Sequence, residues 1–245
     1  DNKLLFSNDV GDITAIDLDQ QVIIWTKNIL SQNSISNNLV FKISNILIDK
    51  KEVFVSSNSG DLFNFNVESG EIKWSQKLTS IQNHISTDKY LFVLTENGFV
   101  VAFNKTNGNI LWSVNLSKLS KDSKIKVDYY GLLLASNNLY ATSSNGDIYK
   151  ISALDGKYIS HKKINSDLSR APIVVDNKIF ILKDNAIITK IKELDNIKNK
   201  KIKDIIYSEI TNEFKENDKF LKDTRDLYLN LSIFQNNYES FLKNN

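Results

Sequence analysis

Short stretches in which apolar and polar residues alternate run through most of the chain. In the stretch 62–67, for example, three apolar side chains fall on one side of an extended backbone, and Leu62 and two asparagines fall on the other. A period of two is typical of a β-strand that packs one apolar face on another layer. The stretches 53–56, 91–94 and 179–182 are rich in the β-branched and aromatic residues that favour strands. The pattern predicts a mainly β protein built from short strands.

Four stretches with this pattern superimpose without gaps, namely residues 5–25, 54–74, 92–112 and 140–160. A fifth and weaker copy covers residues 179–191, in which Asn185 takes the position that glycine has in the others. Successive copies are 49, 38, 48 and 39 residues apart, measured between the aligned positions Gly11, Gly60, Gly98, Gly146 and Asn185. Internal repeats of roughly 40 to 50 residues are typical of β-propeller blades.

Each copy has two turns, and the first three copies end on tryptophan. Glycine marks the first turn, at Gly11, Gly60, Gly98 and Gly146, and the second turn, at Gly70, Gly108 and Gly156. Glycine suits both positions because it adopts the positive φ angles of tight hairpins. The tryptophans all stand fourteen residues after a first-turn glycine, at Trp25, Trp74 and Trp112. We expect each copy to form one small antiparallel sheet and the recurring indole to wedge between neighbouring sheets, rather than to stack on a ligand.

This succession of strand, Asn-Gly or Ser-Gly turn, strand and Gly-x-Ile-x-Trp resembles the blade repeat of the PQQ-type β-propellers. Within that superfamily, residues 52–194 are similar to the C-terminal half of the outer-membrane assembly lipoprotein family BamB. The similarity is clearest in the segments 68–78, 96–116 and 154–191. The resemblance implies four-stranded blades over residues 1–192, about five of them visible, as part of an eight-bladed ring.

The resemblance also implies a function. Members of the BamB family are non-enzymatic scaffolds at the periplasmic face of the bacterial outer membrane, where they assist the BamA-centred insertion of β-barrel proteins. The implied partner is therefore a protein, the periplasmic modules of BamA, with no cofactor, nucleic acid or small-molecule substrate. The chain opens inside a blade, so the lipid-bearing cysteine and the first blades are expected upstream of Asp1. One partner loop of the family would fall at residues 39–44, which lack acidic side chains, so no partner-binding residue is assigned.

Residues 193–245 follow a different pattern. They contain no glycine, proline or tryptophan, and apolar residues recur every three to four positions, as Ile202, Ile206 and Ile210 do. This spacing predicts a tail of two amphipathic helices with a break near residues 216–218. We expect the apolar stripe of the helices to pack on the propeller or on itself, with docking to a partner as the alternative.

Composition narrows the function further. The 245 residues carry a net charge of only +2, and no basic stripe of the kind that binds nucleic acid is apparent. The repeat leaves a PQQ-dependent quinoprotein dehydrogenase open as an alternative. Such enzymes typically place a cysteine pair over the cofactor, however, and this chain has no cysteine. A generic propeller adaptor with a different protein partner is the second alternative.

Candidate chemical groups are few. The chain has two histidines, His84 and His161, and we expect both to be solvated because each stands among polar residues. We interpret Asp17, Asp19 and Asp147 as turn or solvent-facing carboxylates, since they lack the clustering of a calcium-binding loop. No nucleophile elbow and no phosphate-binding loop occurs in the sequence. The sequence thus predicts no catalytic, cofactor-binding or metal-binding residue.

Overall fold

The computed structural model describes residues 2–30, 40–119, 127–164, 167–168, 170–175 and 178–191. These residues form eighteen strands and one 3-10 turn, Leu116–Lys118, so this part of the chain is mainly β, as predicted. The helical tail predicted for residues 193–245 lies outside the described residues.

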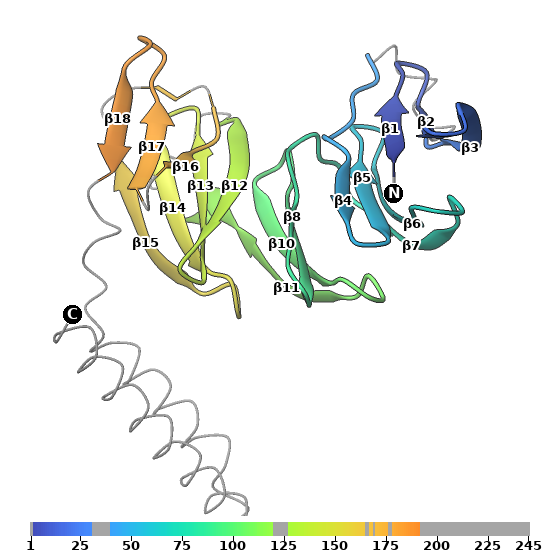
Figure 1. Cartoon of the computed structure of the whole chain (residues 1–245). Coiled ribbons are helices and arrows are strands. Elements are labelled where there is room, and N and C mark those ends of the chain that lie inside the picture. Colours follow the sequence, from blue (N-terminus) through green and yellow to red (C-terminus); the bar gives the residue numbers. More distant parts are fainter. Residues whose placement is uncertain are drawn as a thin grey trace, which may run out of the picture. The chain divides into compact units, whose positions relative to one another are not determined.

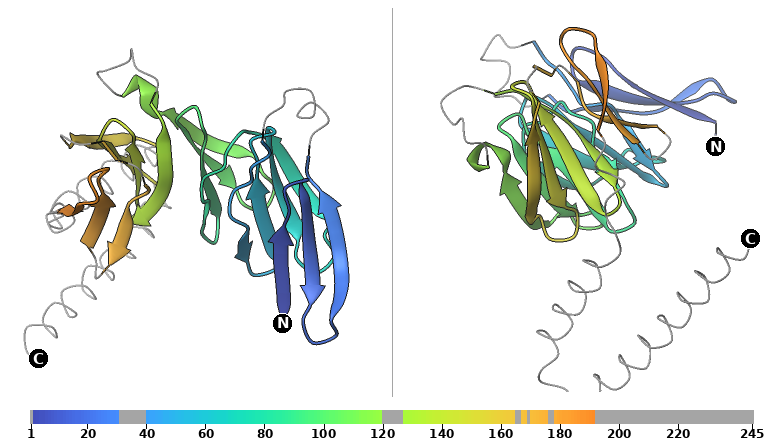
Figure 2. Two further views of the ribbon diagram at one scale, coloured as in Figure 1. Left: turned by 90° about the horizontal axis from the view of Figure 1, so that it is seen from above. Right: turned by 90° about the vertical axis from the view of Figure 1, so that its left-hand side faces the viewer.

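The strands form five antiparallel sheets that follow one another in chain order (Figure 1 and Figure 2). The first sheet contains β1 (Lys3–Ser7), β2 (Asp12–Asp17) and β3 (Val22–Asn28). The second contains β4 (Leu47–Asp49), β5 (Glu52–Ser56), β6 (Asp61–Asn66) and β7 (Ile72–Lys77), and the third β8 (Ile85–Ser86), β9 (Tyr90–Leu94), β10 (Phe99–Asn104) and β11 (Ile110–Asn115). The fourth contains β12 (Tyr129–Ala135), β13 (Asn138–Ser143), β14 (Asp147–Ser152) and β15 (Tyr158–Lys163), and the fifth β16 (Ile173–Val175), β17 (Lys178–Leu182) and β18 (Ile188–Ile191).

The prediction of one small antiparallel sheet for each repeat is confirmed. Three sheets have four strands, while the first has no counterpart of β4 and the fifth no counterpart of β7 within the described residues. We call the last strands of the first four sheets, β3, β7, β11 and β15, the closing strands. Each contains one bulge at the same place, as where Leu111 stands between the register pairs Ala102–Trp112 and Phe103–Ile110. A bulge bends the strand and increases its local twist.

Both faces of the inner sheets are buried, whereas the alternation predicted one apolar face. Asn64, which lies on the side of β6 predicted to be polar, is completely buried. The physical reason is that each inner sheet packs between two others. Val53 of the second sheet shares a core with Ile13 of the first, and Phe54 of the second sheet shares a core with Leu91 of the third.

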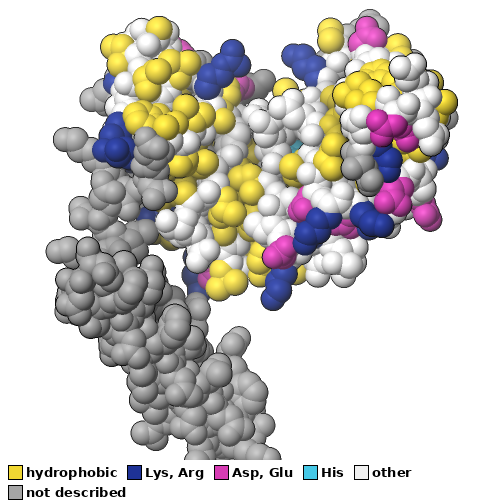
Figure 3. All heavy atoms as spheres, in the orientation of Figure 1, with side chains coloured by type: hydrophobic (Ala, Val, Ile, Leu, Met, Phe, Trp, Pro, Cys, Tyr) yellow, Lys and Arg dark blue, Asp and Glu magenta, His cyan; other side chains and the backbone are white. Residues whose placement is uncertain are grey.

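The two end sheets expose apolar residues whose counterparts are buried elsewhere. Val53, Leu91 and Leu139 occupy one position of the repeat and are completely buried, whereas their counterpart in the first sheet, Leu4, is 47% exposed. In the fifth sheet, every residue of Ile173–Val175 (β16) is exposed. Figure 3 shows hydrophobic side chains at the surface over both end sheets, at the upper right and the upper left.

The first turn of the fifth repeat is shifted by one residue from the predicted position. Ala186, and not Asn185, has the positive φ of 61°. Its N–H donates to Lys183 O at 3.0 Å, just as Gly146 N–H donates to Ser143 O at 3.0 Å in the fourth repeat. Asn185 instead accepts the N–H of Ile187 through its side chain at 3.3 Å. The prediction placed the positive φ at Asn185 because asparagine tolerates positive φ better than alanine does. Local propensity therefore misplaced the turn by one residue.

Candidate functional site

The seams between the first four sheets are formed by tryptophans of the closing strands. Each indole lies against the second turn of the next sheet and donates its Nε1 hydrogen to a backbone carbonyl there. The bonds are Trp25 to Val67 O at 3.0 Å, Trp74 to Lys105 O at 2.9 Å and Trp112 to Leu154 O at 3.1 Å. A buried indole combines a large apolar area with one donor that needs a partner, and this arrangement satisfies both.

The second-turn glycines are required by this docking as well as by the turn. A Cβ atom at Gly70, Gly108 or Gly156 would lie 2.6 Å from the indole that packs there. All three also have positive φ, between 66° and 73°. At the first turns the demand differs between repeats. At Gly60 it is conformational, since φ is 104° and the nearest atom to an added Cβ is 3.9 Å away, whereas a Cβ at Gly98 would clash with the ring of Tyr129.

The docking is not continued at either end of the series. In the first sheet, Gln21 occupies the second-turn position with a φ of 58°, where the next three sheets have the glycines against which the indoles pack. In the fourth sheet, Ser160 stands where the other closing strands have tryptophan, pairing with Lys150 as Trp112 pairs with Ala102. Among the described contacts at the junction of the fourth and fifth sheets is the bond from Thr142 Oγ1 to Arg170 O at 3.0 Å, and Leu168, Ile179 and Ile181 are buried in this region.

His84 lies in a buried polar cluster between the second and third sheets, and its predicted exposure to solvent was wrong. The residue is 6% exposed. Ser56 Oγ donates to Ser80 O at 2.7 Å, so the proton in the 2.9 Å bond between Ser56 Oγ and His84 Nε2 comes from the imidazole. Among the described atoms, His84 Nδ1 has no hydrogen-bond partner.

This serine and histidine are close enough for a catalytic dyad, but their surroundings do not suit one. A nucleophilic serine needs access to substrate and a base that a third group orients. Ser56 is completely buried, and the second ring nitrogen of His84 is unpaired within the described structure. The cluster therefore connects the second and third sheets and does not form a catalytic site. Its burial also lowers the pKa of His84 from 6.5 to about 4.

Acidification is expected to destabilise the protein through His84. The unfolded chain takes up the proton near pH 6.5 and the folded protein only near pH 4, so the free energy of unfolding is highest above pH 6.5 and falls as pH drops between these values. The loss amounts to about 3 kcal/mol at most. Urea unfolding from about pH 7.5 down to pH 4.5 measures it. His84→Gln should flatten this slope and His161→Gln should leave it; an unchanged slope in His84→Gln would contradict the assignment.

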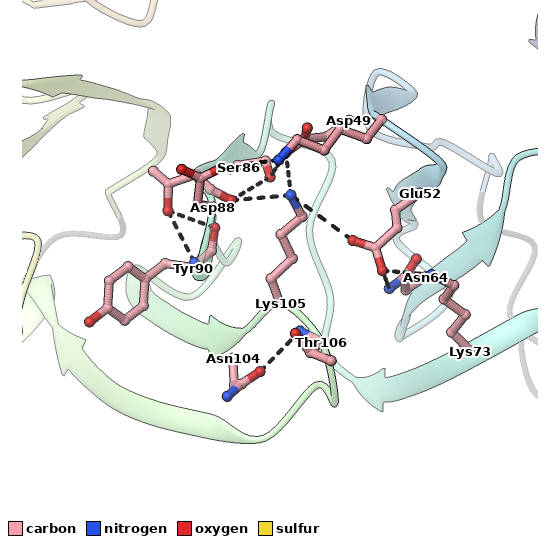
Figure 4. A network of polar contacts seen from close by, with 12 residues as sticks. Asp49, Glu52, Asn64, Lys73, Ser86, Asp88, Tyr90, Asn104, Lys105 and Thr106 are labelled. Atoms are coloured by element: carbon pink, nitrogen blue, oxygen red, sulfur yellow. Dashed lines mark hydrogen bonds and ion pairs between the residues drawn. The ribbon is translucent and has the colours of Figure 1, made fainter.

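A second polar cluster lies around Lys105, in the second turn of the third sheet (Figure 4). Lys105 is 5% exposed. Its ammonium group forms an ion pair with Asp49 of β4, lies 4.0 Å from Glu52 Oε2 of β5, and donates to Thr87 O at 3.2 Å. Asp49 also accepts a hydrogen bond from Ser86 of β8. The cluster thus connects the second and third sheets beside the docked Trp74.

The two carboxylates of this cluster face two cations, because Lys73 Nζ lies 2.9 Å from Glu52 Oε1. The hydrogen bond from Lys105 is the main cause that holds the pKa of Asp49 below its usual 3.8, and the bond from Ser86 adds to it. This site was not predicted from the sequence, although the sequence contains a signal for it. Val67 and Ala153, which occupy the position of Lys105 in the neighbouring repeats, are apolar. A lysine at a repeat position that is otherwise apolar indicates a buried charge with its own partners.

The carboxylates singled out in the sequence have different surroundings. Asp17 Oδ1 accepts the N–H groups of Asp19 and Gln20 at 2.9 Å, so it is a turn carboxylate, as predicted. Asp147 is not solvent-facing, because it is 2% exposed and lies 3.5 Å from Lys163 on the adjacent β15. A cross-strand pair on a covered face explains this burial, which the sequence pattern did not reveal.

The expected partner loop at residues 39–44 is described from Val40 onward. Val40 is 75% exposed, whereas Ser44 is buried and Ile43 packs against the core of the first two sheets. Within the described part of this stretch, Val40 and Lys42 are the residues exposed to a partner. No three His, Asp or Glu side chains of the described residues converge on a possible metal site, and no helix among them could cross a membrane.

Comparison with known proteins agrees with the repeat and the docking geometry. A family model described as outer membrane protein assembly factor BamB matches residues 1–114 and 96–198. The chain belongs to the BamB family. A search of curated proteins with the sequence of this BamB-family chain found no match.

Solved structures show the same fold. BamB from Moraxella catarrhalis superimposes with a TM-score of 0.64 at 19% identity, over 77% of this chain and 55% of that one. The computationally designed protein Ika8 superimposes with a TM-score of 0.57 at 14% identity, over 78% of this chain and 55% of that one. The dihydro-heme d1 dehydrogenase NirN superimposes with a TM-score of 0.58 at 9% identity, over 78% of this chain and 41% of that one. This BamB-family chain thus spans about half the length of the Moraxella BamB.

Proposed function

We propose that this chain is part of a non-enzymatic scaffold for the assembly of outer-membrane β-barrel proteins at the periplasmic face of the outer membrane. The observation that carries the proposal is the BamB family match, which extends over residues 1–198. The seams support it physically. Sheets locked by docked indoles hold their connecting loops in fixed positions, and a preorganised surface loses little conformational entropy when a partner binds.

The proposed partner is the periplasmic part of BamA. The chain spans about half of the Moraxella BamB, so it would supply only a share of the contact surface of a whole BamB protein. Val40 is available for such a contact because it is 75% exposed at the connection from the first to the second sheet.

Co-purification tests this function. Tagged full-length chain is mixed at micromolar concentration with the periplasmic modules of BamA from the same organism, and we expect a complex on size-exclusion chromatography. Val40→Glu should weaken the complex, whereas the matched change Ile72→Glu on β7 should not. Absence of a complex from the folded chain would contradict the proposal. Binding of pyrroloquinoline quinone with calcium, followed by absorbance, would favour a quinoprotein instead.

A further inference from the structure

The closing hairpin of the third sheet, β10 with β11, presents no charged side chain to solvent. Its only charged residue is Lys105, which is buried and paired with Asp49. The other closing strands all carry exposed lysines, namely Lys27 in β3, Lys73 and Lys77 in β7, and Lys162 and Lys163 in β15. Exposed lysines on an edge strand hinder pairing with a strand of another chain. The closing strand β11 lacks this protection.

The difference extends to the end of the hairpin next to the first turn. In the second sheet, Asp61 and Lys77 form an ion pair of 2.6 Å across the closing hairpin, and Asp147 with Lys163 does the same in the fourth sheet at 3.5 Å. The third sheet has the register pair Phe99–Asn115 at this position. Phe99 is 39% exposed, so an aromatic ring replaces the carboxylate at the surface.

The other end of the hairpin is apolar as well. Ile110 is 59% and Leu111 48% exposed, at the start of β11. Trp112 is less deeply buried than the equivalent Trp25 and Trp74. Its indole donates to the carbonyl of Leu154, a residue of the fourth sheet that is 62% exposed. The exposed apolar surface therefore continues across the seam into the fourth sheet.

β11 also has a free hydrogen-bonding edge. It lies at the end of the sheet order β11-β10-β9-β8 and pairs with β10 alone among the described strands. All four closing strands share the bulge, so the bulge does not distinguish β11, whereas its lack of charge does. Backbone groups on such an edge recognise an extended chain, and the neighbouring side chains select what that chain carries.

We propose that β11 binds an extended, largely apolar β-strand of a partner protein, which joins the third sheet as a fifth strand. The occupant continues the existing ladder β8 to β11 and covers the apolar residues Phe99, Ile110 and Leu111. A strand rich in valine, threonine and leucine matches this surface, since a charged side chain placed over it would lose hydration without gaining a counter-ion. The inference does not rest on the proposed function, because it concerns a surface that the BamA test does not use.

Fluorescence anisotropy with a labelled peptide of about eight alternating threonine and valine residues tests the proposal. The chain itself supplies a matched pair of variants. Ser113 and Ser75 occupy the same register position in β11 and β7, and both are exposed. We expect Ser113→Lys to weaken peptide binding about tenfold or more, and Ser75→Lys to leave it unchanged. Leu111 occupies the position in β11 that Lys73 occupies in β7. Leu111→Lys should therefore weaken peptide binding as Ser113→Lys does.

Hydrogen exchange of the full chain locates the bound peptide. Amides of residues 110–115 should gain protection when the peptide is added, and those of β3, β7 and β15 should not. Equal binding by the Ser113→Lys and Ser75→Lys variants would overturn the proposal, as would protection at another edge. Self-association of the wild-type chain that Ser113→Lys abolishes would also overturn it, since the occupant would then be a second copy. Because BamA is absent from this experiment, its outcome is separate from that of the co-purification.

Discussion

Replacing Trp74 with alanine is expected to lower the free energy of unfolding by about 3–5 kcal/mol. The indole is 8% exposed, packs with Phe54 and Phe103, and donates to Lys105 O at 2.9 Å. Its loss leaves a cavity at the seam between the second and third sheets and removes a donor from a buried carbonyl. Urea unfolding followed by circular dichroism measures the change. Trp112→Ala should cost less, because that indole is only half-buried.

Gly108→Ala provides the partner for a double-mutant cycle. The new Cβ would lie 2.6 Å from the ring of Trp74, at a φ of 73°. The single variant should be strongly destabilised, and part of that loss should disappear when Trp74→Ala removes the ring. Gly60→Ala is the control for backbone strain alone, because its Cβ would meet no atom closer than Thr79 Oγ1 at 3.9 Å. Strict additivity of the two changes would contradict a direct contact.

Lys105→Ala is expected to lower the free energy of unfolding by about 3–5 kcal/mol, since it leaves the Asp49 carboxylate without its cation. Lys105→Met should cost less than Lys105→Ala, because methionine keeps most of the packed side chain. Adding Asp49→Asn to Lys105→Met should restore stability, because the unpaired charge is then gone. Lys50→Ala is the control, since Lys50 forms an exposed pair with Asp88 and should have little effect. Equal losses for Lys105→Ala and Lys50→Ala would refute a role for the buried pair.

The same cluster gives a second dependence on pH. The folded pKa of Asp49 is lowered below 3.8, so its stabilising contribution is complete above that value and is lost as pH falls through the folded pKa. This range lies below the one in which His84 acts. The difference in unfolding midpoint between the wild type and Asp49→Asn should therefore stay constant between about pH 7 and pH 5. At lower pH this difference should become smaller.

Repetition made most of the fold predictable from the sequence. Glycine and tryptophan at fixed intervals mark the turns and the seams together. If the copies were aligned one residue out of register, these glycines and tryptophans would no longer coincide in any of them. The prediction failed where only one copy carried the information. Ala186 was missed because a single weak repeat was placed by the propensity of Asn185, whereas the turn closes through the hydrogen bond from Ala186 N–H to Lys183 O.

Burial of polar groups was the other part that could not be predicted. His84 and Asp147 stand among polar neighbours in sequence, and solvent exposure was the natural expectation. Both are buried because sheets pack on both faces, so even a polar stretch between strands can enter a seam. Lys105 shows that comparison between repeats would have helped, since its counterparts Val67 and Ala153 are apolar.

The substitution of Ser160 for tryptophan has a mechanical consequence. Three indoles link the first four sheets into one series, whereas the fourth closing strand has Ser160 at that position and offers the fifth sheet no indole. Under a pulling force applied through β18, the fifth sheet should detach first and at the lowest force. The four remaining sheets would then resist unfolding as a single stiff body. Detachment of the fifth sheet would thus protect them from a force that is applied to residues C-terminal to β18.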